Sequence, residues 1–158
     1  MLAVMTVAAC AGHRPPSQAD PQAPVVIRDV AVVDVVSGTL RPHTTVTAVG
    51  ARISVVAPAA DTNVPAGALV IDGGGRFLMP GLWDMHSHSL WSPEAMPAFL
   101  PLYVAQGVGQ VADMVLLRSN PLANIRATRE IDAVVLRGQV LDRRSLDDLL
   151  AAAAKSQK

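Results

Sequence analysis

The stretch Val25-Val26-Ile27-Arg28-Asp29-Val30-Ala31-Val32-Val33-Asp34 decides the fold class of this 158-residue chain. Most of its residues are β-branched, and such side chains are restricted in helices and pack well on a pleated strand. Similar short apolar runs follow, most of them bounded by turn-forming residues, at 45–57, 68–71, 76–79, 112–117, 131–136 and 139–141. Short strands at this close spacing predict a mainly β fold, a small antiparallel sheet or sandwich.

Two helices are expected beside the strands. The first runs from about Ala98 to Gln106, after a start signal in which Ser92 is the N-cap and Pro93 the first helical residue. The second begins at Ser145, where Ser145 to Asp148 resembles a capping box, and ends near Lys155.

Composition excludes two classes of protein. The chain carries 13 basic and 13 acidic residues, so its net charge is zero and it lacks the basic stripe of a nucleic-acid binder. It is 51% hydrophobic, but no apolar run reaches the roughly 18–20 residues that a membrane-spanning helix needs.

The first ten residues resemble the end of a bacterial lipoprotein signal peptide. An apolar run ends in Val7-Ala8-Ala9-Cys10, which matches a lipobox, so Cys10 would be the lipidated residue and the Pro-rich stretch up to Pro24 its tether. This predicts a location in the bacterial cell envelope, lipid-anchored or periplasmic. A signal peptide normally opens with positive charge, yet no basic residue precedes Arg14, and the alternative is an Ala-rich N-terminus with an incidental cysteine.

The candidate metal ligands lie in Met79-Pro80-Gly81-Leu82-Trp83-Asp84-Met85-His86-Ser87-His88. On a strand, residues i and i+2 point to the same face, so His86 and His88 could bind one metal ion at about 2.0–2.1 Å each. Spacing alone is weak evidence, because most such pairs are surface or core histidines. Asp84 could orient one of the two rings from the second coordination sphere, or it could be an ordinary strand-end residue.

The whole stretch from Ile71 to His88 resembles the first barrel strand of the amidohydrolase superfamily, with its pattern Pro-Gly-(Leu/Phe)-x-Asp-x-His-x-His. Residues 25–34 and 52–56 resemble the N-terminal β-sandwich strands of that superfamily, and residues 112–125 with 131–138 resemble its C-terminal ones. The closest resemblance is to the imidazolonepropionase-like group of cyclic amidases and prolidases, and it covers about residues 25–150.

The resemblance implies a (β/α)₈ barrel that holds one or two divalent metal ions, usually zinc. His86 and His88 would be the two ligands from the first strand, while later strands supply a Lys, two further His and an Asp. The metal activates water for hydrolysis of carbon–nitrogen bonds in a small-molecule amide or dipeptide substrate.

The chain departs from this family after the motif. A (β/α)₈ barrel needs roughly 200 residues or more, and far fewer follow Asp84. The other histidines, His13 and His43, lie upstream, and the lysines, Lys155 and Lys158, lie in the tail. A catalytic zinc normally has three protein ligands, so Asp84, Glu94 or Asp113 would have to complete a makeshift site. Nothing in the spacing requires this, and the alternative for Asp113 is that it begins a strand.

We therefore expect a truncated and inactive relative of a metal-dependent hydrolase. The expected organisation is a signal and tether at 1–24, an N-terminal β-sandwich segment at 25–79, a barrel remnant of first strand and helix at 80–111, and a C-terminal sandwich segment and helix at 112–158. The alternatives are a non-catalytic, membrane-anchored β-sandwich lipoprotein domain and a deletion fragment. Because the remnant strand would lack its barrel neighbours, self-association is also expected.

Overall fold

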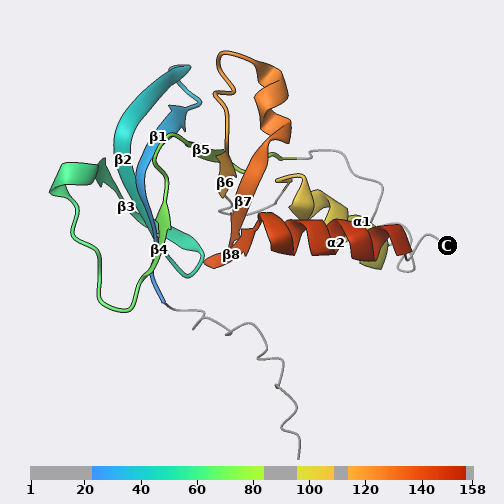
Figure 1. The fold of residues 1–158 in the computed structure, drawn as a ribbon. Helices are drawn as coiled ribbons and strands as arrows, with labels where there is room; N and C mark the ends of the chain where they lie inside the picture. Colours follow the sequence, from blue (N-terminus) through green and yellow to red (C-terminus); the bar gives the residue numbers. More distant parts are fainter. Residues whose placement is uncertain (1–22, 84–95, 109–113, 156–158) are drawn as a thin grey trace, which may run out of the picture.

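The computed structural model describes residues 23–83, 96–108 and 114–155, and it confirms a mainly β fold (Figure 1). Eight strands form one sheet with the path β3-β2-β1-β5-β6-β7-β8, and β4 is attached to β1 off this path. The strands are β1 (Val25–Asp34), β2 (Thr39–Val49), β3 (Arg52–Pro58), β4 (Leu69–Asp72), β5 (Phe77–Pro80), β6 (Met114–Leu117), β7 (Ile131–Leu136) and β8 (Gln139–Asp142). The helices are α1 (Met96–Ala105) and α2 (Arg143–Lys155), with short 3₁₀ turns η1 (Ala59–Asp61) and η3 (Ile125–Arg129).

Strand β1 connects the N-terminal and C-terminal parts of the sheet, because along one side it pairs first with β4 and then with β5. It pairs with β2 in antiparallel fashion along most of its length. On its other side, the first half pairs in parallel with β4 and the second half, at Ala31 and Val32, pairs in parallel with β5. The change of partner follows a bulge, since Ile27 lies opposite Val46 but the next pair is Val30 with Thr44. An extra residue bends a strand and increases its twist.

The chain passes from β4 to β5 directly over this bulge, and only a glycine fits there. The Gly73 backbone N–H donates to the Arg28 carbonyl oxygen at 2.7 Å, and the Ala31 N–H donates to the Arg76 carbonyl oxygen at 3.1 Å. A Cβ atom on Gly73 would lie 2.6 Å from the Val30 Cβ. The Gly73-Gly74-Gly75 run is thus the turn between β4 and β5.

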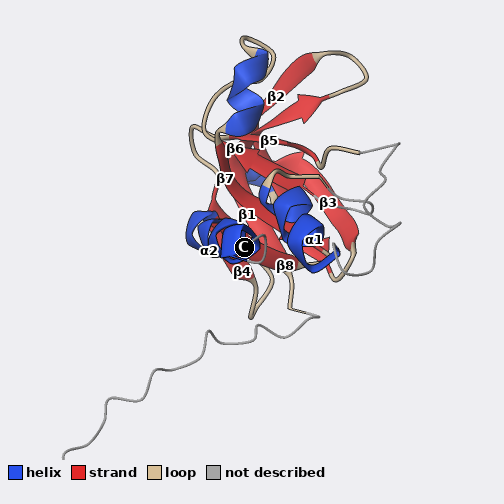
Figure 2. Ribbon diagram, turned by 90° about the vertical axis from the view of Figure 1, so that its right-hand side faces the viewer, coloured by secondary structure: helices blue, strands red, loops and turns tan. Residues whose placement is uncertain are grey.

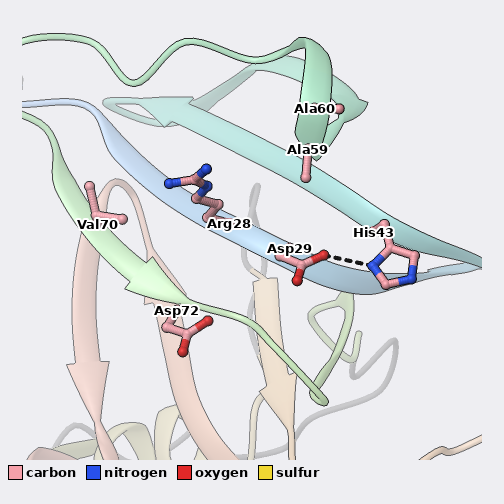
Figure 3. Close-up of a pocket in the computed structure, with 7 residues that line it drawn as sticks. All are labelled: Arg28, Asp29, His43, Ala59, Ala60, Val70 and Asp72. Atoms are coloured by element: carbon pink, nitrogen blue, oxygen red, sulfur yellow. Dashed lines mark hydrogen bonds and ion pairs between the residues drawn. The ribbon is translucent and has the colours of Figure 1, made fainter.

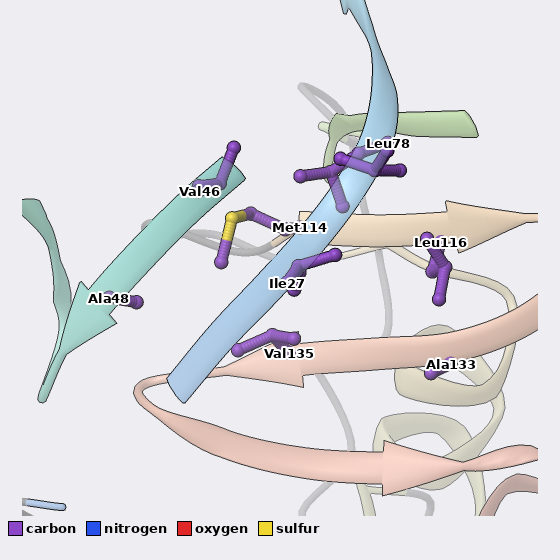
Figure 4. Close-up of a cluster of buried hydrophobic side chains, with 9 residues drawn as sticks. Ile27, Val46, Ala48, Leu78, Met114, Leu116, Ala133 and Val135 are labelled. Atoms are coloured by element: carbon purple, nitrogen blue, oxygen red, sulfur yellow. The ribbon is translucent and has the colours of Figure 1, made fainter. Parts of the chain in front are cut away.

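The bend brings the N-terminal and C-terminal strands around one hydrophobic core (Figure 4). This core combines residues from both ends of the chain, namely Ile27, Val30, Val46, Ala48, Leu78, Met114, Leu116, Ala133 and Val135. Neither segment could bury these side chains alone, since each supplies one wall of the core. The expected sandwich of N- and C-terminal segments is therefore confirmed.

A second core lies on the opposite face of the C-terminal strands, beneath the helices (Figure 2). It consists of Ala105, Val115, Leu117, Ile131, Val134 and Leu146, and further partly buried residues of α2 pack against it. All four residues of β6 are buried, because alternate side chains enter the two cores. Strands β5 to β7 thus form a middle layer between the N-terminal strands and the helices.

The barrel remnant is visible as the start of a β-α-β unit around α1. Leu82 follows β5 and forms a parallel bridge with Val108, which follows α1. The Leu82 backbone N–H donates to the Gly107 carbonyl oxygen at 2.8 Å. A helix that connects two parallel strand segments is the repeating unit of a (β/α)₈ barrel, and it agrees with the expected first strand and helix.

Both helix starts differ from the sequence-based expectation. Helix α1 begins two residues before Ala98, and its expected N-cap, Ser92, lies outside the described residues. In α2 the cap is Asp142 and not Ser145, because the Asp142 carboxylate accepts hydrogen bonds from the Ser145 backbone N–H at 2.9 Å and from its hydroxyl at 2.7 Å. These hydrogen bonds lower the pKa of Asp142. No helix within the described ranges is long and apolar enough to cross a membrane.

Replacement of Gly138 by alanine tests the contact between the two sandwich segments. Gly138 has a φ of +79° in the β7–β8 turn, and a Cβ there would lie 2.7 Å from the Gly50 carbonyl oxygen in the β2–β3 turn. We expect Gly138→Ala to lower the free energy of unfolding by about 1 kcal/mol for the left-handed backbone and by a further ~1–3 kcal/mol for the overlap. Urea unfolding followed by circular dichroism measures the total loss in free energy of unfolding.

Gly38→Ala is the matched control, since Gly38 also has a positive φ, +66°, but nothing lies within 4 Å of an added Cβ. Gly38→Ala should lower the free energy of unfolding only by the contribution of the left-handed backbone conformation. Equal losses in the two variants would mean that the turns do not restrain each other.

Acid sensitivity is expected from Asp34, which closes the β1–β2 connection. Its carboxylate accepts from the backbone N–H groups of Ser37 and Val36 and from Arg41, and these bonds lower its pKa from 3.8 to about 2. Because the pKa is lower in the folded state, this contribution to stability is complete above the unfolded pKa and is lost as pH falls towards 2. The free energy of unfolding should therefore depend less on pH between 4 and 2 in Asp34→Asn than in the unmodified chain.

Thermal unfolding across this pH range provides the measurement, with Asp61→Asn, an exposed position on η1, as the control. An unchanged pH dependence in Asp34→Asn would argue against this role.

Candidate functional site

The residues singled out from the sequence lie outside the part of the chain that the structure describes. This applies to His86, His88, Asp84 and Cys10, and also to Glu94 and Asp113. The described flanks place the start of the motif, since Leu82 leaves the sheet at the end of β5 and pairs with Val108. The chain therefore enters the stretch that contains Asp84, His86 and His88 from the end of a strand.

The described residues by themselves contain no candidate metal centre. Across residues 23–83, 96–108 and 114–155, no group of three or more His, Cys, Asp or Glu side chains could hold a metal ion. His43 lies in β2 with its side chain 84% exposed, and it is bonded to an aspartate.

A pocket of about 640 Å³ lies on the outer side of the N-terminal strands (Figure 3). Its residues come from β1, β2, η1 and β4, and they are Arg28, Asp29, His43, Ala59, Ala60, Val70 and Asp72. Four of them carry ionisable side chains, while the alanines and Val70 form an apolar wall. The pocket exists because the connection from β3 to β4 carries η1 over the bulge in β1.

Asp29 in the bulge of β1 and His43 in the adjacent register shift of β2 both have an uncommon backbone conformation. Asp29 and His43 have φ values of +57° and +47°, which are rare for residues other than glycine. Their side chains meet across the two strands, with 2.9 Å between His43 Nδ1 and Asp29 Oδ1. An ionised carboxylate only accepts hydrogen bonds, so Nδ1 is the donor and Nε2 is left facing solvent.

The remaining ionisable groups of the pocket lie on adjacent strands. Arg28 in β1 is paired in register with Asp72 in β4, so both side chains lie on the same face of the sheet. The Arg28 guanidinium forms no ion pair or side-chain hydrogen bond with any described residue. One oxygen of Asp72 accepts from the Gly74 backbone N–H at 3.0 Å, and its other oxygen is available.

The buried hydroxyl oxygen of Thr45 lies on β2 opposite two residues of this pocket, Arg28 and Asp29. Thr45 is 1% exposed, and its hydroxyl oxygen has no hydrogen-bond partner among the described residues. Because Ile27 pairs with Val46 and Val30 with Thr44, Thr45 lies opposite the bulge residues Arg28 and Asp29. Buried hydroxyl groups normally have a partner, so this one indicates a position for water or a ligand atom.

The sequence carries a signal for this pocket that is easy to overlook. Arg28-Asp29 places two charges in the middle of an apolar β-branched run, where a regular strand would bury at least one of them. The break in the pattern marks the bulge, but nothing local shows that His43 and Asp72 lie beside it.

Comparison with known proteins gives matches to part of the chain only. No family model matches it. It is 38% identical over 66 residues to adenine deaminase 3 of Rhizobium meliloti (strain 1021), which is 42% of this chain and 11% of that protein. It is 40% identical over 93 residues to adenine deaminase 2 of Agrobacterium fabrum (strain C58 / ATCC 33970), which is 58% of this chain and 15% of that protein.

Among solved structures, phenylurea hydrolase B is 28% identical, with a TM-score of 0.47 over 56% of this chain and 24% of that one. A D-aminoacylase is 26% identical, with a TM-score of 0.42 over 53% of this chain and 17% of that one. The sequence matches to the deaminases confirm the family resemblance that the sequence indicates. The chain spans less than a sixth of the length of these curated relatives.

Proposed function

We propose that this chain, a relative of the amidohydrolase superfamily, derives from metal-dependent hydrolases of carbon–nitrogen bonds and has little or no hydrolytic activity by itself. If active, it would act on a small-molecule amide or dipeptide. The proposal concerns this polypeptide and not the longer relatives, whose further residues it lacks.

The observation that supports it is the short connection between the barrel remnant and the C-terminal strands. Val108 pairs in parallel with Leu82, as the second strand of a barrel would, yet the antiparallel strand β6 already begins at Met114. Residues 109–113 are too few for even one more β-α unit, which takes about 30 residues or more. The strands that would present further metal ligands therefore have no residues in this chain.

We propose that His86 and His88 form half of a site for zinc or another divalent metal ion, with Asp84 in the second coordination sphere. A bound zinc would supply an activated water in a complete site. Two imidazoles alone bind the ion weakly, because even an open catalytic site has three protein ligands.

A second candidate function is a non-catalytic β-domain that Cys10 anchors to a membrane of the bacterial cell envelope. The complete core supports it, since both sandwich segments are present and close around the same side chains. Self-association is part of this proposal, because Leu82, Trp83, Phe99 and Leu100 are 39%, 66%, 40% and 46% exposed around the barrel remnant.

Hydrolysis assays test the first proposal. We expect the purified chain with added zinc or manganese to cleave neither dipeptides nor cyclic amides above the rate of buffer, because the water-activating site is incomplete. His86→Ala should behave like the unmodified chain. His43→Ala is the matched control, since it removes an exposed imidazole that lies outside the motif.

Metal analysis of the same preparations completes the test. After dialysis we expect clearly less than one zinc per chain. Metal-dependent turnover, or about one retained zinc that is lost in both His86→Ala and His88→Ala, would contradict the proposal of half a site.

Fractionation tests the membrane anchor. In a bacterial host we expect the unmodified chain to incorporate labelled fatty acid and to sediment with membranes, whereas Cys10→Ser should do neither, because the thiol is the acylated group. The single cysteine makes the label unambiguous. Equal partitioning of the two forms would be evidence against lipidation.

A further inference from the structure

We propose that the pocket between η1 and the bulge in β1 is a binding site for a small zwitterion, an α-amino acid with an apolar side chain. This site is separate from the His86 and His88 motif and does not depend on it. The pocket offers a basic group, two acidic groups and an apolar wall (Figure 3). These would bind the carboxylate, the ammonium group and the side chain of the ligand, respectively.

The carboxylate of the ligand would bind Arg28. The guanidinium has no ion-pair partner among the described residues, although Asp29 and Asp72 lie close to it in the fold. A guanidinium pairs with a carboxylate through two parallel hydrogen bonds, so an unpaired arginine in a pocket suits this group.

The ammonium group of the ligand would lie between Asp29 and Asp72. One carboxylate oxygen of Asp29 is hydrogen-bonded to His43 Nδ1 at 2.9 Å. One carboxylate oxygen of Asp72 accepts a hydrogen bond from the Gly74 backbone N–H at 3.0 Å. Each carboxylate keeps a second oxygen that can accept from an ammonium group. Their side chains are thus oriented before the ligand arrives, which lowers the entropy cost of binding.

The side chain of the ligand would contact the apolar wall. Val70 is 47% exposed, and Ala59 and Ala60 extend from η1 on the opposite side of the pocket. The volume of about 640 Å³ is in the range of small-molecule sites and leaves room for a branched aliphatic side chain.

The combination of charges disfavours simpler ligands. A lone anion would meet the carboxylates of Asp29 and Asp72 as well as Arg28, and a lone cation would meet the Arg28 guanidinium as well as the carboxylates. A metal ion lacks the three ligands it would need here, since the described residues contain no such group. A ligand that carries both charges satisfies both sets of groups.

The backbone of the bulge also supports a binding role. Asp29 in the bulge of β1 and His43 in the adjacent register shift of β2 both have a positive φ, and such strained positions are concentrated at binding sites.

Titration of the full ¹⁵N-labelled chain with L-leucine tests the proposal by nuclear magnetic resonance. Saturable shifts are expected at the amides of residues 28–30, 43–45, 59–60 and 70–72, with millimolar affinity. Isovalerate retains the carboxylate and isoamylamine the ammonium group, and each should bind about tenfold more weakly than leucine, which is about 1.4 kcal/mol.

Arg28→Gln should weaken leucine binding about tenfold or more, whereas Arg126→Gln, an exposed arginine outside the pocket, should leave it unchanged. Asp72→Asn should weaken leucine and isoamylamine but not isovalerate. The proposal is overturned by absent or non-saturable shifts up to ~50 mM, by equal affinity for the three probes, or by equal effects of the two arginine variants.

Discussion

The bend in β1 at Arg28 and Asp29 is the constraint on which the rest of the structure depends. It lets one strand pair with β4 before the bend and with β5 after it, while β2 follows it on the other side. Through this strand the N-terminal and C-terminal segments share one sheet and close around one core. A straight strand would keep one pair of neighbours, and the two segments could not face each other.

This arrangement explains how the N-terminal and C-terminal strands bury their apolar side chains together. The middle strands bury both faces, one against the N-terminal strands and the other against α1 and α2. The described members of both cores come from the strands of the sheet and from the two helices. On the side where Leu82 and Val108 pair, the exposed apolar side chains Trp83, Phe99 and Leu100 occur.

The same bend creates the pocket. A bulge adds residues that the opposite strand does not match, so Arg28 and Asp29 leave the regular alternation of the strand and take positions on its outer side. The chain therefore has two separate candidate sites. One is the stretch with His86 and His88, for which we propose half of a metal site. The other is a cluster of charges that the present sandwich itself assembles.

Much of the fold could be predicted from the sequence because the strands and turns are local. The β-branched run at Val25–Asp34 and the motif around His86 were each recognisable without coordinates, and the resemblance to the amidohydrolase superfamily rests on them. The start of α2 could not be placed as well, since Ser145 and Asp142 are both good caps and only the folded position of Asp142 shows which one acts. Tertiary structure alone decided that Arg28, His43 and Asp72 lie around one pocket. They come from three strands whose register depends on the bulge, and long-range strand pairing of this kind leaves no local trace in a sequence.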